Sequence, residues 1–321
     1  MFDFFGDIGS LIMSPLYYAI SAILLGFHKV FGALFGPESG AAWVLSIIGL
    51  TLVIRAALIP LFVKQIKSSR NMQLIQPKVR ALQEKYGHDR ELLAQETMKL
   101  YKEAGTNPFA SCLPLLLQMP IFLALFRLID RAAQEPEMTR GLMSVQLNQQ
   151  FADATLFGAK ISDTFMLTDL LGVRVMAVIL VLAMTATTFL TQRQLMSKNM
   201  PADALTGPFA QQQKIMLYVL PLVFAFSGVY FPIGVLFYWT TSNLWTMGQQ
   251  FYVIRNNPAP GTPAEKAKED RDRAKLAKKG KRLPADIERE KQQAAAEVAA
   301  EERRSARQQP QKKPRSERKK K

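Results

Sequence analysis

An apolar run at residues 42–62 contains a single charged side chain, Arg55. The run is long enough to cross the hydrocarbon core of a bilayer, which takes roughly 20 residues. An arginine at such a position costs roughly 2.5–3.5 kcal/mol on insertion scales, so another group must compensate it. The other apolar runs, 113–126, 175–192 and 215–254, contain no Asp or Glu to pair with it. The sequence therefore predicts that Arg55 lines a hydrated cavity inside a helical bundle.

The composition separates an apolar chain from a charged tail. Hydrophobic residues make up 49% of the 321 residues, whereas residues 256–321 are mostly charged or small. These last 66 residues hold 21 Lys and Arg against 11 Asp and Glu, which contributes +10 to a net charge of +15. Such a composition cannot bury a core and predicts a basic, disordered tail. We expect three parts: an outer N-terminal segment at 1–42, a membrane core at 43–255 and the tail at 256–321.

Few residues are suited to catalysis or metal binding. One cysteine, Cys112, excludes a disulfide within the chain, and two histidines, His28 and His88, argue against a zinc site. A membrane protease would need a Ser–His pair, paired Asp residues or a metal, and no His or Asp lies within a predicted span. We therefore expect no enzyme activity, catalytic residue, metal or cofactor. The acidic start, with Asp3 and Asp7, argues against a cleavable signal peptide.

The apolar runs predict an all-α integral membrane protein with five transmembrane helices. The charges between the runs predict their orientation, because Lys and Arg are enriched in cytoplasmic loops. Segment 64–111 carries nine Lys and Arg against five Asp and Glu, and segment 193–214 carries three against one. The N-terminus is then predicted outside and the C-terminus in the cytoplasm. The predicted spans are 43–63, 112–129, 172–192, 214–231 and 233–254.

Residues 14–35 are apolar, but a polar stripe runs along them. Ser14, Ser21 and His28 recur every seven residues and would share one face of a helix. We interpret this segment as an amphipathic helix that lies on the outer membrane surface. A sixth transmembrane helix is the alternative.

Segment 64–108 predicts a cytoplasmic helical hairpin. Apolar residues recur at spacings of three and four on both sides of Gly87, His88 and Asp89, where the two helices break. These stripes are too narrow for an independent core, so the hairpin is either a solvated loop or a docking surface. Residues 130–171 form an outer loop with weak periodicity, to which we assign no role.

Several strings of residues, in order along the chain, resemble the YidC/Oxa/Alb family of membrane protein insertases. The first span is similar to the arginine helix of the family, and Leu74–Gly87 to its cytoplasmic hairpin. The resemblance covers about residues 15–255 and is to the Gram-positive, actinobacterial-like form, without the large outer domain of some bacterial members. The other matching strings are Asn107-Pro108, Cys112–Phe122, Gln212–Met216, Ser242–Leu244 and Gln249-Gln250.

The resemblance implies an ATP-independent insertase of the bacterial plasma (inner) membrane. Nascent membrane proteins would enter the bilayer through a hydrophilic groove that opens to the cytoplasm and to lipid, alone or with the Sec translocon. Arg55, Thr51 and Gln118 map to groove positions of the family. On the fifth span the family often has Tyr where this chain has Trp239, with Tyr238 just before it. This departure leaves the substrate-contacting residue of the pair open.

Uncharged polar residues on the third and fifth spans agree with a hydrated groove. Asn243 is one of them, and we include it among the candidate groove residues. For each such residue alone, an ordinary hydrogen bond between helices is the simpler interpretation. The others are Thr185, Thr188, Gln192, Thr241, Thr246 and Gln250.

Two further function classes fit parts of the sequence. A solute transporter or channel could use Arg55 as an anion site, although no inverted repeat is evident. Ribosome binding through the basic tail and the cytoplasmic loops is compatible with an insertase, because ribosomal RNA exposes phosphate. The alternative for the tail is that it sets topology or contacts anionic lipid.

Overall fold

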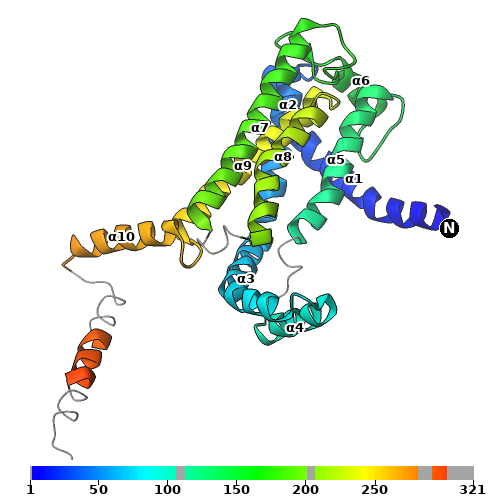
Figure 1. Ribbon diagram of the computed structural model, residues 1–321. Coiled ribbons are helices and arrows are strands. Elements are labelled where there is room, and N and C mark those ends of the chain that lie inside the picture. Colours follow the sequence, from blue (N-terminus) through cyan, green and yellow to red (C-terminus); the bar gives the residue numbers. More distant parts are fainter. Residues whose placement is uncertain (1, 106–112, 201–206, 281–290, 302–321) are drawn as a thin grey trace, which may run out of the picture. The chain divides into compact units, whose positions relative to one another are not determined.

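A computed structural model describes residues 2–105, 113–200, 207–280 and 291–301 (Figure 1). The chain forms two compact units, Met1–Glu265 and Lys266–Lys321. Among the described residues of both units, helices dominate, and the only strands form one short antiparallel hairpin. The elements are α1 (Phe2–Phe35), α2 (Gly40–Ala57), α3 (Ile59–Tyr86), α4 (Arg90–Glu103), α5 (Leu113–Gln134), α6 (Val145–Asp153), β1 (Thr155–Leu156), β2 (Ala159–Lys160), α7 (Leu171–Asn199), α8 (Gly207–Gly228), α9 (Ile233–Asn256) and α10 (Pro263–Ala277).

The described helices agree with an all-helical membrane protein. Three of them contain stretches that are long and apolar enough to cross a bilayer: Met13–Phe35, Gly40–Ala57 and Leu171–Asn199. Lys214–Gly228 is a shorter apolar helix. The predicted count of five spans stays a prediction.

The first predicted span, 43–63, belongs to two helices. Helix α2 ends at Ala57 and α3 begins at Ile59, with a proline in its first turn, where the missing N–H is tolerated. The Leu58 N–H donates to the Ile54 carbonyl, and the Phe62 N–H donates to the Leu58 carbonyl, both at 3.1 Å. The chain therefore runs almost without interruption from the apolar helix into the charged hairpin.

Helices α3 and α4 pack against each other and form the predicted hairpin, which breaks at residues 87–89. The Asp89 carboxylate caps α4 by accepting from the N–H groups of Glu91 and Leu92, at 3.1 and 3.0 Å. Ile75 and Val79 of the predicted stripe are buried, whereas α4 has no buried residue. This thin apolar contact matches the narrow stripes in the sequence.

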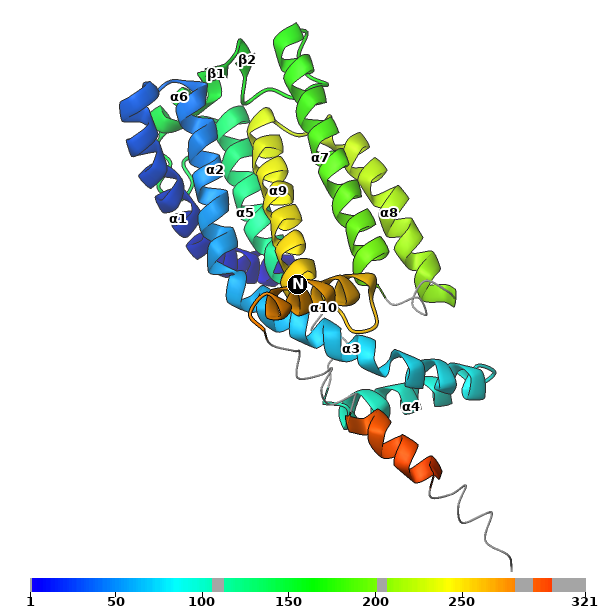
Figure 2. The same cartoon turned by 90° about the vertical axis from the view of Figure 1, so that its left-hand side faces the viewer.

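Two of the three residues of the polar stripe of α1, Ser21 and His28, face the protein interior, whereas Ser14 is exposed. Helix α1 packs along α2 (Figure 2). The buried Ser21 hydroxyl accepts from the Leu142 N–H at 2.9 Å, and the His28 ring stacks on Trp43 with centroids 3.8 Å apart. Periodicity alone shows that Ser21 and His28 share a face, and the contacts show that this face is a packing surface. The position of this helix on the outer membrane surface, or across the membrane, stays a prediction.

The segment between α5 and α7 is folded, although its periodicity is weak. It contains α6 and the β1–β2 hairpin, in which Thr155 pairs with Lys160. Phe151 and Ile161 are almost fully buried in the main core. Backbone hydrogen bonds also join it to α9, since the Gly234 N–H donates to the Ile161 carbonyl at 2.8 Å. The helix and strands of this segment are too short to produce a recognisable hydrophobic periodicity in the sequence.

The compact unit of the core extends beyond residue 256, where we expected the tail to begin. The Asn199 side chain accepts from the Ala259 N–H at 2.7 Å, and Thr262 is buried. The first unit consequently includes residues up to Glu265. In the second unit, residues 291–301 are helical and exposed.

Candidate functional site

Burial changes along the length of the helix bundle. Helix α9 packs against α2, α5 and α7. In Figure 2, α6 and β1–β2 lie at one end of these helices, and α3 and α4 lie at the other. Buried residues gather toward the first end, which we call the closed end. They stop at Thr51 in α2, begin at Ala124 among the described side chains of α5, and become sparse after Thr187 in α7 and Ser242 in α9. Thr51, Tyr238 and Ser242 lie at the edge of this buried region. Arg55 and Gln118 lie beyond it, in the opposite half, which we call the open end.

Arg55 lies in the last turn of α2 and is partly buried. Its guanidinium donates a hydrogen bond to the hydroxyl of Ser242 on α9, which is itself buried. The Phe62 ring lies 6.0 Å from the guanidinium carbon. Within the described ranges, no carboxylate forms an ion pair with Arg55. The charge is therefore held by a neutral hydroxyl and an aromatic ring, as the lack of acidic residues in the spans led us to expect.

Gln118 and Tyr238 link α5 to the same face of α9. The Gln118 side-chain amide donates to the Tyr238 hydroxyl at 2.8 Å, and Tyr238 precedes Ser242 by one helical turn. The Gln118 side-chain oxygen is buried and has no hydrogen-bond partner among the described residues. Three helices thus bring a cation, two hydroxyls and an amide to one place.

Two other candidates have local roles in helix packing. The Thr51 hydroxyl is fully buried and donates to the Ile47 carbonyl at 2.6 Å. The Asn243 amide donates to the Thr188 hydroxyl of α7 at 3.0 Å, which is a hydrogen bond between helices. These contacts do not test whether Thr51 and Asn243 contribute to a groove, which stays a prediction.

Trp239 and Tyr238 both contact the Phe122 ring, whose centroid lies 6.2 Å from that of Tyr238, but their other neighbours differ. The Trp239 ring contacts those of Phe122, Phe224 and Phe231, with centroids 5.2, 4.8 and 5.6 Å apart. These aromatic residues come from α5, α8 and the turn before α9. Trp239 therefore belongs to an aromatic cluster, whereas Tyr238 belongs to the polar set around Arg55.

A family model and curated relatives match most of this chain. The family model described as 60Kd inner membrane protein matches residues 34–260. A membrane protein insertase YidC from Streptomyces avermitilis is 46% identical over 267 residues, covering 80% of this chain and 61% of the relative. The chain belongs to the YidC insertase family. A second YidC, from Tropheryma whipplei strain Twist, is 38% identical over 281 residues and covers 82% of this chain, which spans 90% of that relative.

A crystal structure of an active YidC insertase with its first transmembrane domain resolved is also similar. It has a TM-score of 0.45 and 27% identity, and the match covers 73% of this chain and 46% of that one. Membership in the YidC family agrees with the apolar helices found here, since the family is one of inner membrane proteins.

Ser242 is the residue of this site that sequence reasoning missed. It lies within one of the strings that resemble the YidC family, but its pairing with Arg55 joins positions 187 residues apart. Its position one turn after Tyr238 was the only available signal, and it does not reveal which helix lies opposite.

Proposed function

We propose that this protein inserts nascent membrane proteins into the bilayer through a hydrophilic groove at the open end of the bundle. The observation that carries this proposal is the Arg55 guanidinium, which is partly buried and bonded to a neutral hydroxyl. A permanent charge without a counter-charge is costly inside a membrane. Such charges therefore usually mark functional sites. The filled closed end supports a groove that does not continue into a pore.

Arg55 would act by attracting acidic segments of incoming chains. A cation attracts an anion more strongly in a low-dielectric surround than in bulk water. A short acidic tail drawn toward Arg55 would have less distance left to cross. The hydrophobic helix of the substrate would then contact exposed apolar side chains of α7 and α9, such as Leu182 and Leu244.

The proposed topology has α2, α5, α7, α8 and α9 as the five spans. The N-terminus lies outside, and α3, α4 and the tail lie in the cytoplasm, because these segments are rich in Lys and Arg. The groove then opens toward the side where nascent chains are made. Insertion would require no ATP and would proceed alone or with the Sec translocon.

The tail would bind the translating ribosome through RNA phosphate. Truncation after Glu265 tests this without disturbing the core, because it keeps the Asn199–Ala259 contact. In detergent, ribosome co-sedimentation of the full chain should exceed that of residues 1–265 and should weaken steeply with salt. Equal binding by both chains would assign ribosome contact to the cytoplasmic hairpin instead.

Site-specific crosslinking during translation tests the groove. A photoreactive residue replaces Thr246, one turn beyond Ser242, and Asp153 at the closed end serves as the matched control. We expect a small nascent membrane protein to crosslink from position 246 and not from 153. Crosslinking from neither position, together with anion flux into vesicles that hold the purified protein, would favour the transporter alternative.

A further inference from the structure

The closed end carries exposed apolar side chains on its outside. Phe157 is 89% exposed, Leu167 84% and Leu171 75%, which is unusual beside a core that is otherwise filled. Met166 and Leu170 are also exposed. We call these five residues the apolar rim.

Two glycines without side chains allow two parts of the rim to approach each other. A Cβ atom on Gly172 would lie 3.3 Å from the Gly158 carbonyl oxygen, so these two glycines approach closely. Phe157 precedes Gly158, and Leu171 precedes Gly172. The tip of the β1–β2 hairpin and the first residue of α7 therefore lie next to each other.

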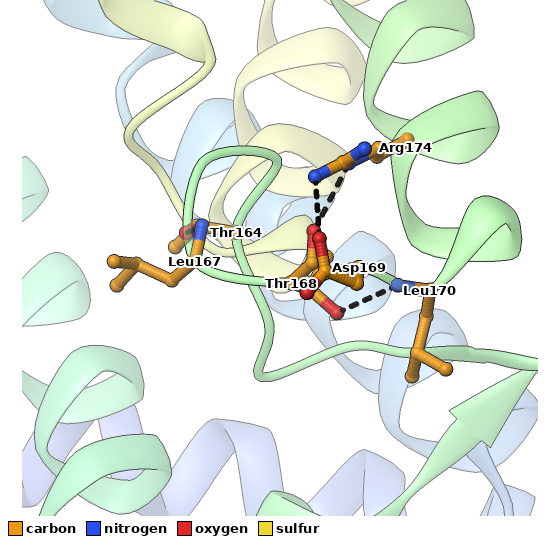
Figure 3. Close-up of polar contacts among 6 residues, drawn as sticks. All are labelled: Thr164, Leu167, Thr168, Asp169, Leu170 and Arg174. Atoms are coloured by element: carbon orange, nitrogen blue, oxygen red, sulfur yellow. Dashed lines mark hydrogen bonds and ion pairs between the residues drawn. The ribbon is translucent and has the colours of Figure 1, made fainter.

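Polar contacts fix the shape of the loop that carries Leu167 and Leu170 (Figure 3). The Arg174 guanidinium donates to the Thr168 carbonyl and to the Asp169 carboxylate, each at 3.0 Å. The N–H groups of Leu167 and Leu170 donate to threonine hydroxyls of the same loop, each at 3.2 Å. Loop polar groups are thus bonded to one another, while the two leucine side chains point away from these contacts.

Phe157 also has a strained backbone. It is the first residue of the two-residue turn between β1 and β2, and its φ of 50° is in the left-handed region. Such turns favour Asn, Asp or Gly at this position, and a bulky side chain there is an outlier. A strained aromatic residue that is also almost fully exposed suggests a selected contact outside the protein.

The length of the apolar part of α7 indicates where the rim would lie relative to the bilayer. Twenty residues of helix, roughly 30 Å, span the hydrocarbon core. Counted back from Thr191, just before the polar pair Gln192-Arg193, twenty residues end at Gly172. Arg174 lies inside this stretch, but its guanidinium reaches the loop at the end, as expected of an arginine near an interface. The rim then lies at the level of the lipid headgroups.

We propose that the apolar rim inserts into the outer headgroup interface of the bilayer and holds α7 at a fixed depth. The occupant of this surface is lipid, because the rim continues into the exposed apolar face of α7 at Val175 and Val178. The proposal rests on α7 as a span, which is part of the proposed function, but not on the groove or on insertion.

Spin labels in the full chain test this proposal. A nitroxide is attached to a single cysteine at Phe157 or Leu167 in a Cys112→Ser background, and the protein is placed in phosphatidylethanolamine–phosphatidylglycerol vesicles. Collisions with oxygen, which partitions into lipid, are compared with collisions with a water-soluble nickel chelate. Labels at Asp153, which is 79% exposed at the same end, and at Leu182, in the middle of α7, are the controls.

We expect the oxygen-to-nickel ratio at 157 and 167 to exceed that at 153 several-fold and to lie below that at 182. Ratios at both rim positions equal to that at 153 would overturn the proposal, because the rim would face water. Low collision rates of the rim labels with both reagents would also overturn it, because they would mean that a protein partner or second copy covers the rim. A label at 182 outside lipid would contradict the span of α7, and so the proposed function as well.

Discussion

The two ends of one bundle differ in what fills the space between the same helices. At the closed end, Trp43, Ile47 and Phe151 are fully buried, and a Cβ on Gly234 would lie 3.3 Å from the Phe151 ring. At the open end, the helices bring together Arg55, Ser242 and other polar groups. The difference arises from side-chain chemistry along each helix, not from separate domains. Apolar side chains fill one end, whereas polar side chains gather at the other.

This comparison implies opposite contributions to stability and activity. Closely packed apolar side chains stabilise the closed end through van der Waals contacts, which drive association of helices in lipid. At the open end, the Arg55 charge costs roughly 2.5–3.5 kcal/mol on membrane-insertion scales. Substitutions at the closed end should therefore lower stability first, and those at the open end should lower insertion first.

The largest expected effect is on stability, at the closed end. Phe151→Ala should destabilise the protein by about 3–5 kcal/mol, because it leaves a cavity between α2, α5 and α9. Thermal unfolding in detergent measures this loss. Phe226→Ala, on an exposed position of α8, is the control and should shift stability by about 0.5 kcal/mol or less. Similar losses for both variants would mean that the closed end is not the tighter part of the bundle.

The next effect is on activity, at the open end. Arg55→Ala should reduce insertion of substrates with acidic translocated tails about tenfold, equivalent to roughly 1.4 kcal/mol. Arg55→Lys should retain much of the activity if the charge matters, whereas a strict need for arginine would indicate bidentate geometry. The measurement compares substrates with acidic, neutral and basic tails. Equal dependence of all three on Arg55 contradicts an electrostatic role.

Two buried serines, one at each end of the bundle, allow a direct comparison of the two ends. The Ser46 hydroxyl donates to the Ala42 carbonyl at the closed end, whereas the Ser242 hydroxyl accepts from Arg55 at the open end. Ser242→Ala should lower insertion several-fold, because the Arg55 guanidinium loses the hydroxyl that accepts its hydrogen bond. Ser46→Ala should leave insertion unchanged. If both variants insert equally well, Ser242 does not position Arg55.

Much of the fold could be predicted from the sequence because its signals are local. Apolar run length indicated the membrane helices, and Gly87 and Asp89 marked the break in the hairpin. The segment 130–171 could not be predicted, since Phe151 and Ile161 become core residues only through contacts with distant helices. The periodicity of α1 indicated that Ser21 and His28 share a face, but not that both pack inside the protein, because periodicity does not say what a face contacts.

The candidate site could be predicted only in part. The absence of acidic residues from the spans indicated that Arg55 has no ion pair, and the structure agrees within its described ranges. Its actual partner, Ser242, could not be inferred, because nothing local specifies which face of α9 meets α2. For the same reason, Asn243 and Thr188 were both noted as polar residues, but their mutual hydrogen bond was not.

The smallest expected effect concerns the strained turn on the outside of the closed end. Phe157→Asn should raise stability in detergent by about 1 kcal/mol, because Asn tolerates the left-handed conformation that costs other residues roughly 1–2 kcal/mol. Phe157→Ala is the matched control. Like Asn it removes the ring, but it lacks the short polar side chain that lets Asn adopt the left-handed conformation. The Asn variant should therefore unfold at a higher temperature than the Ala variant. Equal unfolding temperatures would mean that the turn is not strained in solution. A higher temperature for Asn would show that the closed end, which is filled for stability elsewhere, keeps a destabilising aromatic residue at its surface, as expected if Phe157 serves the bilayer contact.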